Sequence, residues 1–469
     1  MNASDRADLV VVGGGGLAGL VAAARASELG RRVVVLEAGA DERYACNARM
    51  SGGVFHIAFT EIKSPPATLR AAIDRATEGR ADAAQADALA TSAGRLVDWL
   101  RTQGTKFVRT QVAWQSHILA PPRPIVAGQE WRGRGPDVLL RQLTENILQR
   151  GGRIERGTRA TSLIMENGRC IGATAVAGEQ TLTFPARAVL LADGGFQADL
   201  ALLGQYIAKH PAGVKQRGGA TGVGDGLRMA RDVGAAASAL DRFYGHLLCR
   251  DAMTSDKVWP YPELDALATS GILVGPDGRR FADEGIGGVA LANAIARLAD
   301  PLSISVVFDG RIWEGPGRSA RIPANPTLAS AGGTIHSQPT LAALAAVARI
   351  DPAGLGATVA AYNAALAERR ATALAPPRSS DRFAAMPVAA APFMAIPLCA
   401  GITYTMGGIS IDGEARVLTT GGQPIPGLYA AGSTTGGLEG GERSVYIGGL
   451  TKAGVQGLIA AEHIAANIG

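Results

Sequence analysis

Three closely spaced glycines near the start of the chain limit the folds it can adopt. The motif Gly14-x-Gly16-x-x-Gly19 follows an apolar run at residues 9–12 and opens an Ala-rich, helix-like stretch. A second apolar run then ends at Glu37. In a strand–turn–helix–strand unit, the first glycine permits a tight turn, the second lets a diphosphate approach the backbone, and the third lets the helix pack on the strand. The chain therefore begins with a predicted dinucleotide-binding βαβ unit.

The same unit indicates which dinucleotide is bound. The helix N-terminus offers N–H groups and partial positive charge to a diphosphate. Glu37 can accept hydrogen bonds from an adenosine ribose. The sequence contains no second glycine motif of this kind for a nicotinamide cofactor. We therefore predict FAD as the cofactor.

Composition excludes other redox groups and several partner classes. The four cysteines lie far apart and the six histidines lack metal-ligand spacing, so we expect no iron–sulfur cluster, structural zinc, c-type haem or other metal site. The net charge is +5, but the arginines are dispersed, which argues against nucleic-acid binding. No apolar run is long enough to cross a bilayer, and the chain passes from its first residues directly into a strand without a signal peptide. We expect a cytoplasmic protein.

The pattern along the chain predicts an interrupted α/β domain. Helical sequence occupies about residues 65–105, and short β runs broken by turns occupy residues 161–191. Pro- and Gly-rich texture then begins near residue 245 and persists to about 395. The apolar run at residues 428–431 is suited to completing the first sheet, and a helix closes the chain. The middle block is therefore predicted to be an insertion rather than a tail.

Several longer motifs carry a resemblance to a known family. They are Leu190-Leu-Ala-Asp-Gly-Gly-Phe196, Tyr244-Gly-His-Leu-Leu248, residues 278–285, Tyr404-Thr-Met-Gly-Gly408 and residues 426–450. With these motifs the chain resembles the fumarate reductase/succinate dehydrogenase flavoprotein superfamily, most closely its tricarballylate dehydrogenase-like branch. The resemblance implies a Rossmann-like FAD-binding domain (1–244 and 396–469) split by an inserted α+β capping domain (245–395). It also implies hydride transfer between a substrate carbon and flavin N5, with proton transfer at the adjacent carbon.

The glycine motif and the resemblance together give a set of expected FAD contacts. Covalent relatives attach the flavin through a His at the position of Cys46, so we expect a noncovalent flavin here. Ser433 replaces an acidic residue common in the family. The expected contacts are Gly14, Gly16, Leu17, Ala18, Gly19, Glu37, Ala38, Asn47, Ser51, Gly52, Gly53, Ala160, Ala192, Gly194, Gly432, Ser433, Gly449 and Leu450.

The resemblance also marks four candidate catalytic residues. His246 occupies the position of a substrate-binding His, and Tyr404 replaces another such His with a phenol, which donates a hydrogen bond but carries no positive charge. Arg443 lies where dicarboxylate enzymes keep an Arg that clamps the substrate. Tyr446 resembles a Tyr of the 3-ketosteroid dehydrogenases that stabilises an enolate. A structural role for each residue remains the alternative.

Our leading hypothesis is an FAD-dependent dehydrogenase that desaturates the C–C bond next to a carboxylate or carbonyl of a small organic acid. Electrons would leave to a separate redox protein or quinone. The alternatives are a 3-ketosteroid or cyclic-ketone dehydrogenase, a fumarate-type enoate reductase, a non-redox isomerase or hydratase that keeps FAD, and a flavoprotein subunit that only binds.

Overall fold

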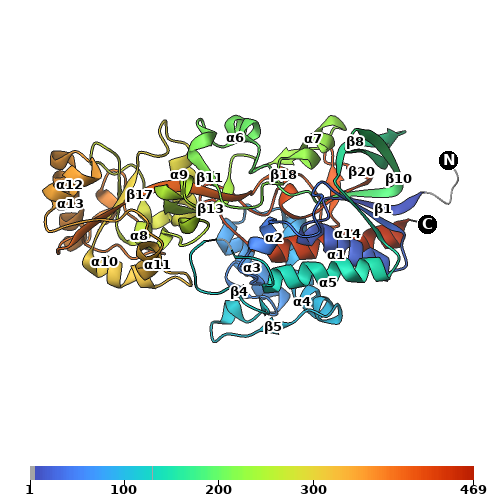
Figure 1. Cartoon of the computed structure of the whole chain (residues 1–469), viewed down its shortest axis with the longest axis horizontal. Helices are drawn as coiled ribbons and strands as arrows, with labels where there is room; N and C mark the ends of the chain where they lie inside the picture. The colour runs from blue at the N-terminus through green and yellow to red at the C-terminus, as the bar shows by residue number, and fades with distance from the viewer. Residues whose placement is uncertain (1–5, 129, 469) are drawn as a thin grey trace.

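The computed structural model describes residues 6–128 and 130–468 and has a mixed α/β fold. Figure 1 shows an elongated molecule with two parts, each built around its own sheet. The first described strand and the last described helix both lie in the part that contains the glycine motif.

The first sheet has eight strands, in the order β19-β20-β10-β1-β2-β7 along its main path. Its parallel centre is formed by β1 (Ala7–Val12), β2 (Val33–Glu37), β7 (Arg153–Arg156), β10 (Gln180–Leu191) and β20 (Pro424–Ala430). The strands β8 (Thr158–Glu166) and β9 (Arg169–Ala177) form an antiparallel meander with β10. The strand β19 (Arg416–Leu418) pairs with β20 at one edge of the sheet. The C-terminal strand β20 pairs with β10, so the end of the chain completes the sheet begun at its start.

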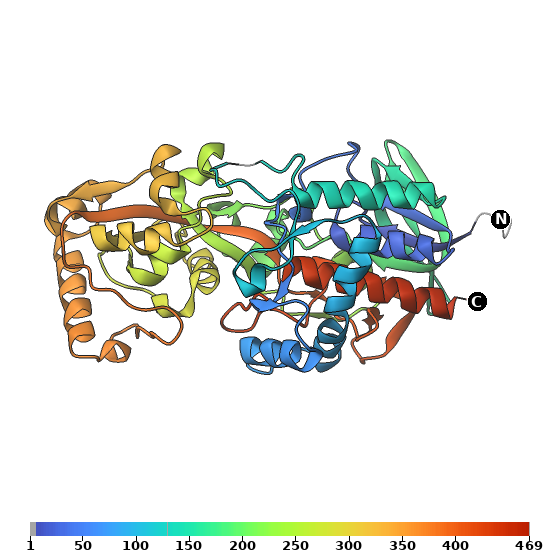
Figure 2. The ribbon, with the colours of Figure 1, turned by 90° about the horizontal axis from the view of Figure 1, so that it is seen from below.

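Helices cover one face of this sheet. They are α1 (Leu17–Glu28), α5 (Gly135–Gln149) and α14 (Gly449–Asn467), which lie side by side in Figure 2. The close approach of α1 and α14 requires Gly457, because a Cβ there would lie 2.4 Å from the carbonyl oxygen of Ala18. Outside this layer, α3 (Pro66–Thr77) and α4 (Ala83–Thr102) form the predicted helical section.

The second sheet is organised by one long strand, β17 (Phe393–Thr405). Its first half pairs with β15 (Ser305–Asp309) and β16 (His336–Gln338), and β15 pairs in turn with β14 (Ile272–Val274). Its second half pairs with β11 (Val214–Gln216) and β13 (Phe243–Cys249). Around this sheet lie α8 (Asp265–Ser270), α9 (Gly288–Ala296), α12 (Leu341–Ala348) and α13 (Pro352–Ala367). Because β17 is continuous, it links the two parts of the molecule (Figure 1).

The predicted domain limits fall within this second sheet. The limit at 244/245 lies inside β13, and the limit at 395/396 lies inside β17. The division into domains stays a prediction. Within the described residues, no helix combines the length and apolar character needed to cross a membrane.

Candidate active site

A large cavity opens at the carboxyl ends of the parallel strands. It is lined by the residues that end or directly follow β1, β2, β10 and β20, and by the first turns of α1 and α14. In open parallel sheets, ligands bind outside the carboxyl ends of the strands. The opposite side of the cavity is closed by residues of β13, β17 and the loop at 260–261. The cavity therefore lies where the two parts of the molecule meet.

The three glycines of the motif have different surroundings. A Cβ at Gly14 would lie 2.2 Å from Val35 Cγ1, and one at Gly19 would lie 2.1 Å from the carbonyl oxygen of Gly13. These two glycines permit the close packing of β1, β2 and α1. Gly16 lines the cavity, and a Cβ there would have no heavy atom of the described residues within 4 Å. The open space beside Gly16 and the N-terminus of α1 suits a diphosphate.

Fifteen of the eighteen expected FAD contacts line this cavity. The three that do not are Gly14, Gly19 and Gly53. The first two are packing glycines, and Gly53 has φ +74° and lines a second, adjoining cavity. The fifteen are Gly16, Leu17, Ala18, Glu37, Ala38, Asn47, Ser51, Gly52, Ala160, Ala192, Gly194, Gly432, Ser433, Gly449 and Leu450.

At the end of β2, Glu37 is buried and accepts a hydrogen bond of 2.7 Å from the backbone N–H of Gly39. The Tyr44 ring, which sequence reasoning missed, also lines the cavity here, beside Gly15 and Gly39. Burial and the neighbouring Glu37 carboxylate raise the pKa of Tyr44. This protonated phenol is therefore a further polar group at the end of the cavity expected to hold the adenosine.

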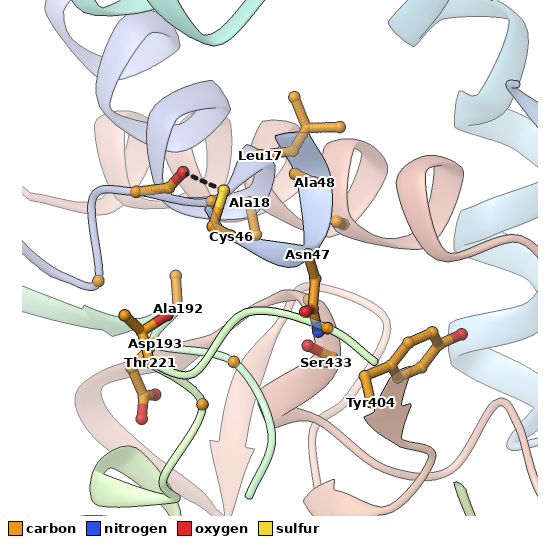
Figure 3. A pocket seen from close by; sticks show the side chains of 18 of the residues that line it. Leu17, Ala18, Cys46, Asn47, Ala48, Ala192, Asp193, Thr221, Tyr404 and Ser433 are labelled. Carbon is orange, nitrogen blue, oxygen red and sulfur yellow. Dashed lines mark hydrogen bonds between the residues drawn. The ribbon is translucent and has the colours of Figure 1, made fainter. Parts of the chain in front are cut away.

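Asn47 and Cys46 fix the backbone rather than presenting free side chains (Figure 3). The Asn47 amide donates to the carbonyl oxygen of Thr403 at 2.8 Å and accepts from the N–H of Gly219 at 2.6 Å. The Cys46 thiol donates to the carbonyl oxygen of Gly15 at 3.0 Å, and burial raises its pKa. A neutral thiol already bonded to backbone is consistent with the expected noncovalent flavin.

Three tyrosines form the wall opposite the glycine motif. Tyr244 stacks on Tyr446 with ring centroids 4.1 Å apart, and its ring lies 5.3 Å from that of Tyr404. Tyr244 and Tyr404 are opposite each other in the β13–β17 pair, next to an irregularity in the register. All three line the cavity. Tyr244 was not among the predicted catalytic residues, although it begins a motif of the family resemblance.

No residue within 6–128 and 130–468 accepts a hydrogen bond from the phenol of Tyr446. Its oxygen accepts a 3.1 Å hydrogen bond from the backbone N–H of Gly449, the first residue of α14. Burial raises the pKa of Tyr446, so the phenol stays protonated. Tyr446 can therefore donate to an oxygen atom in the cavity.

Tyr404 is arranged differently from the expectation. Its hydroxyl donates to both carboxylate oxygens of Glu439, at 2.9 and 3.1 Å. Glu439 also accepts from the N–H of Ile447 at 3.0 Å and from Lys452 at 3.3 Å, and this charged pair is buried. The Tyr404 proton, which we expected to face a carboxylate or carbonyl of the substrate, thus points at Glu439.

His246 does not itself line the cavity but connects to it through Tyr244. The two residues are two apart on β13, so their side chains lie on the same face of the strand. His246 Nδ1 lies 2.6 Å from an Asp265 carboxylate oxygen, and Nε2 lies 2.9 Å from the Tyr244 hydroxyl. Because a carboxylate only accepts, Nδ1 carries the proton and Nε2 is free to accept from Tyr244. Glu263 lies 3.4 Å from the same Nε2.

Arg443 lies elsewhere than we expected, which corrects the predicted substrate clamp. Its side chain is 52% exposed, and its guanidinium pairs with Glu78 at 3.2 Å. The chain turns back at Gly440 and Gly441, both with positive φ, and Gly440 forms a bridge with Val445. This tight turn directs Arg443 to the surface. Arg443 is not among the described residues that line either cavity.

Known proteins share this architecture. The sequence pattern of the "FAD binding domain" family matches residues 8–445. The chain belongs to that family. The FAD-binding chain is 29% identical over 365 residues to the NADH:acrylate oxidoreductase of Vibrio harveyi, covering 74% of its own length but only 33% of the relative's. It is 27% identical over 455 residues to a fumarate reductase (cytochrome) of Shewanella frigidimarina, covering 94% of its own length and 74% of the relative's.

Two further similarities concern ketone enzymes. The FAD-binding chain is 27% identical over 340 residues to the 4-oxocyclohexanecarboxylate 2-dehydrogenase of Sinomonas cyclohexanicum, covering 68% of its own length and 55% of the relative's. Its fold matches a 3-ketosteroid Δ1-dehydrogenase of Sterolibacterium denitrificans with a TM-score of 0.75 at 22% identity, covering 99% and 100% of the two chains. The predicted superfamily, FAD as the cofactor and an FAD-dependent oxidoreductase are thereby confirmed.

The residues present fit FAD. Backbone from the glycine turn and the strand ends surrounds the cavity, and Gly16 leaves open space at the N-terminus of α1. Asp193, which sequence reasoning missed, has a buried carboxylate oxygen without a hydrogen-bond partner in the described structure. Burial raises the pKa of Asp193 to about 6, and the carboxylate accepts from the N–H of Gly226 at 2.8 Å. Protein encloses that oxygen, so the fit to FAD rests on the open backbone surface at Gly16.

Proposed function

We propose that this FAD-binding protein is a dehydrogenase that introduces a C–C double bond next to the carbonyl group of a ketone. The observation that carries the proposal is the chain of contacts from Tyr244 through His246 to Asp265, which begins in the wall of the FAD cavity. Such a chain prepares a proton acceptor, as removal of a proton from carbon requires.

Tyr244 is the proposed proton acceptor. Burial, and after it Tyr446 and Glu263, raises the pKa of Tyr244, so the phenol is protonated before reaction. The Tyr244 oxygen takes a proton from the substrate carbon next to the carbonyl while its own proton passes to His246 Nε2. Asp265 stabilises the resulting imidazolium, as a carboxylate does behind a histidine base.

Tyr446 is the proposed group that polarises the carbonyl. Its free proton and its place beside Tyr244 let it donate to the carbonyl oxygen of the same substrate. Negative charge develops on that oxygen as the neighbouring carbon loses its proton, and a donor aimed there stabilises the charge. Bound FAD supplies the acceptor for the hydride that leaves the adjacent carbon.

The arrangement favours ketones over the carboxylic acids of our leading sequence-based hypothesis. Arg443 is at the surface, which removes the group proposed to clamp a carboxylate, whereas Tyr446 can still donate to a carbonyl oxygen. The similarity to a 4-oxocyclohexanecarboxylate 2-dehydrogenase, a ketone enzyme by its name, supports the same assignment.

Two further parts of the proposal follow from the resemblance. Residues 245–395 act as a cap, supported by the contribution of Pro260 and Tyr261 to the cavity wall. Electrons leave to a separate acceptor, either a redox protein or a quinone.

The test is anaerobic reduction of the FAD-loaded protein, followed through the absorbance of the oxidised flavin. We expect loss of that absorbance with 4-oxocyclohexanecarboxylate or cyclohexanone, but not with succinate or tricarballylate. Reduction of the flavin by succinate or tricarballylate, without reduction by either ketone, would refute the ketone assignment. Oxidation of a reduced dye by an unsaturated acid, without any reduction by ketones, would instead establish a reductase.

A further inference from the structure

The second cavity adjoins the first on the side of the tyrosines. The two share Ser51, Gly52, Tyr244, Tyr261, Tyr446 and Leu450. A substrate whose carbonyl lies beside Tyr244 and Tyr446 therefore has room for its remaining atoms in the second cavity.

Flat aromatic side chains form one side of this second cavity. The His56 and Phe59 rings stack with centroids 5.1 Å apart, and Trp114 meets both edge-on with centroids 5.2 Å away. Burial lowers the pKa of His56 to about 4, so its ring is neutral near neutral pH. This wall suits the apolar body of a ring-shaped substrate.

Two arginines face the same cavity without an acidic partner in the described structure. Arg123 is 8% exposed, donates to the carbonyl oxygens of Met50 and Ser51, and has a buried Nε without a hydrogen-bond partner. Arg321 is half-buried and donates to the carbonyl oxygen of Arg123 at 3.3 Å. Burial, together with the Arg123 charge, lowers the pKa of Arg321.

Glu263 is the one carboxylate among the described residues that line this cavity, and it pairs with Arg217 rather than with Arg123 or Arg321. Glu263 lies 2.8 Å from Arg217 and 3.4 Å from His246 Nε2. It therefore leaves the charges of Arg123 and Arg321 uncompensated. Two partly desolvated cations in one cavity repel each other unless an anion lies between them.

We propose that Arg321 and Arg123 bind a carboxylate at the remote end of the substrate, so that the substrate is a cyclic ketone bearing a carboxylate. The identification of the ketone rests on the proposed function, whereas the carboxylate site is inferred from Arg123 and Arg321 alone. A guanidinium fork binds a carboxylate through two parallel hydrogen bonds, and Arg321 Nη1 lies toward Gly52 on the boundary between the two cavities. Arg321 belongs to the proposed cap and Arg123 to the FAD-binding part, so the carboxylate joins the two parts across the substrate.

The test measures binding rather than turnover. Calorimetric titration of the FAD-loaded protein at low salt compares cyclohexanecarboxylate with the neutral cyclohexanecarboxamide. We expect the carboxylate to bind at least about tenfold more tightly than the amide. Arg321→Gln is expected to remove that preference, and Arg321→Lys to restore part of it, because Lys keeps the charge but loses the fork.

A matched control is Arg318→Gln, three residues earlier. Arg318 is 51% exposed and pairs with Glu314 at 2.8 Å, so its loss is expected to leave the preference intact. Equal binding of acid and amide to the unaltered protein would overturn the inference, as would an unchanged preference in Arg321→Gln or the absence of measurable carboxylate binding. Because no ligand in this titration reacts, failure of ketones to reduce the flavin would refute the proposed function without affecting this result.

Discussion

The two ends of the main cavity are built in different ways. At the end near Gly16, the wall is largely backbone from a turn that is local in sequence. At the end near Tyr244, the wall consists of side chains from β13, β17 and the loop before α14, and Tyr244 lies 160 residues before Tyr404 and 202 before Tyr446.

This difference separates cofactor binding from chemistry. Backbone N–H groups at a helix N-terminus recognise a diphosphate that many enzymes share. The side chains at the other end set proton transfer and substrate choice, and they vary while the fold is kept. Variants at the Gly16 end should therefore change FAD binding or folding. Variants at the Tyr244 end should change the rate of turnover.

The largest effect is expected at Tyr244. Tyr244→Phe removes the proposed proton acceptor, and we expect the rate of flavin reduction by a ketone to fall by about 10³-fold, as for loss of a general base. FAD content should stay unchanged, because the phenol lies at the substrate end. The comparison variant is Tyr206→Phe, whose hydroxyl lies outside both cavities and accepts from Arg231. Retained rapid reduction in Tyr244→Phe would assign the proton to another group.

A pair of glycine variants tests the cofactor end. Gly14→Ala places a methyl group 2.2 Å from Val35 Cγ1, so we expect thermal unfolding to show a loss of about 1–3 kcal/mol even without FAD. The methyl group of Gly16→Ala meets no atom within 4 Å in the part of the chain that the structure describes, so the FAD-free protein should keep its stability. FAD affinity of Gly16→Ala should nevertheless fall by about tenfold or more, because the methyl group occupies space beside the diphosphate. Equal behaviour of the two variants would contradict their assigned roles.

A smaller effect is expected at Asp265, which acts through His246. Asp265→Asn keeps the shape but removes the charge behind the imidazole, so we expect flavin reduction to slow by about 10- to 100-fold. A purely structural role would lower FAD content or thermal stability together with the rate. The proposed role predicts slower flavin reduction while FAD content and thermal stability stay unchanged. Measuring all three quantities distinguishes the two roles.

The smallest effect is expected at Arg443. Arg443→Gln alters an exposed side chain that pairs with Glu78, and exposed pairs contribute about 0–1 kcal/mol. Reduction rates and ligand affinities should change by less than about twofold. A loss of ligand binding of a hundredfold would return Arg443 to the substrate site and require the turn at Gly440 and Gly441 to open.

The fold and the cofactor at the glycine end of the cavity could be predicted from the sequence alone. The glycine spacing, the apolar runs and Glu37 predicted a βαβ unit and FAD, since each of these signals depends on residues close together in the chain. The return of the chain at residues 428–431 to the first sheet was also predicted correctly, because an apolar run after a long insertion requires a buried place.

The arrangement of side chains at the Tyr244 end could not be predicted from the sequence. Whether Tyr244, Tyr404 and Tyr446 meet depends on the register of β13 against β17, and whether Arg443 faces the cavity depends on one tight turn. The meeting of Arg123 and Arg321 depends on how the two parts of the molecule come together. A shift of one residue in a strand reverses the face of every side chain, so residue types and spacing alone could not place these groups.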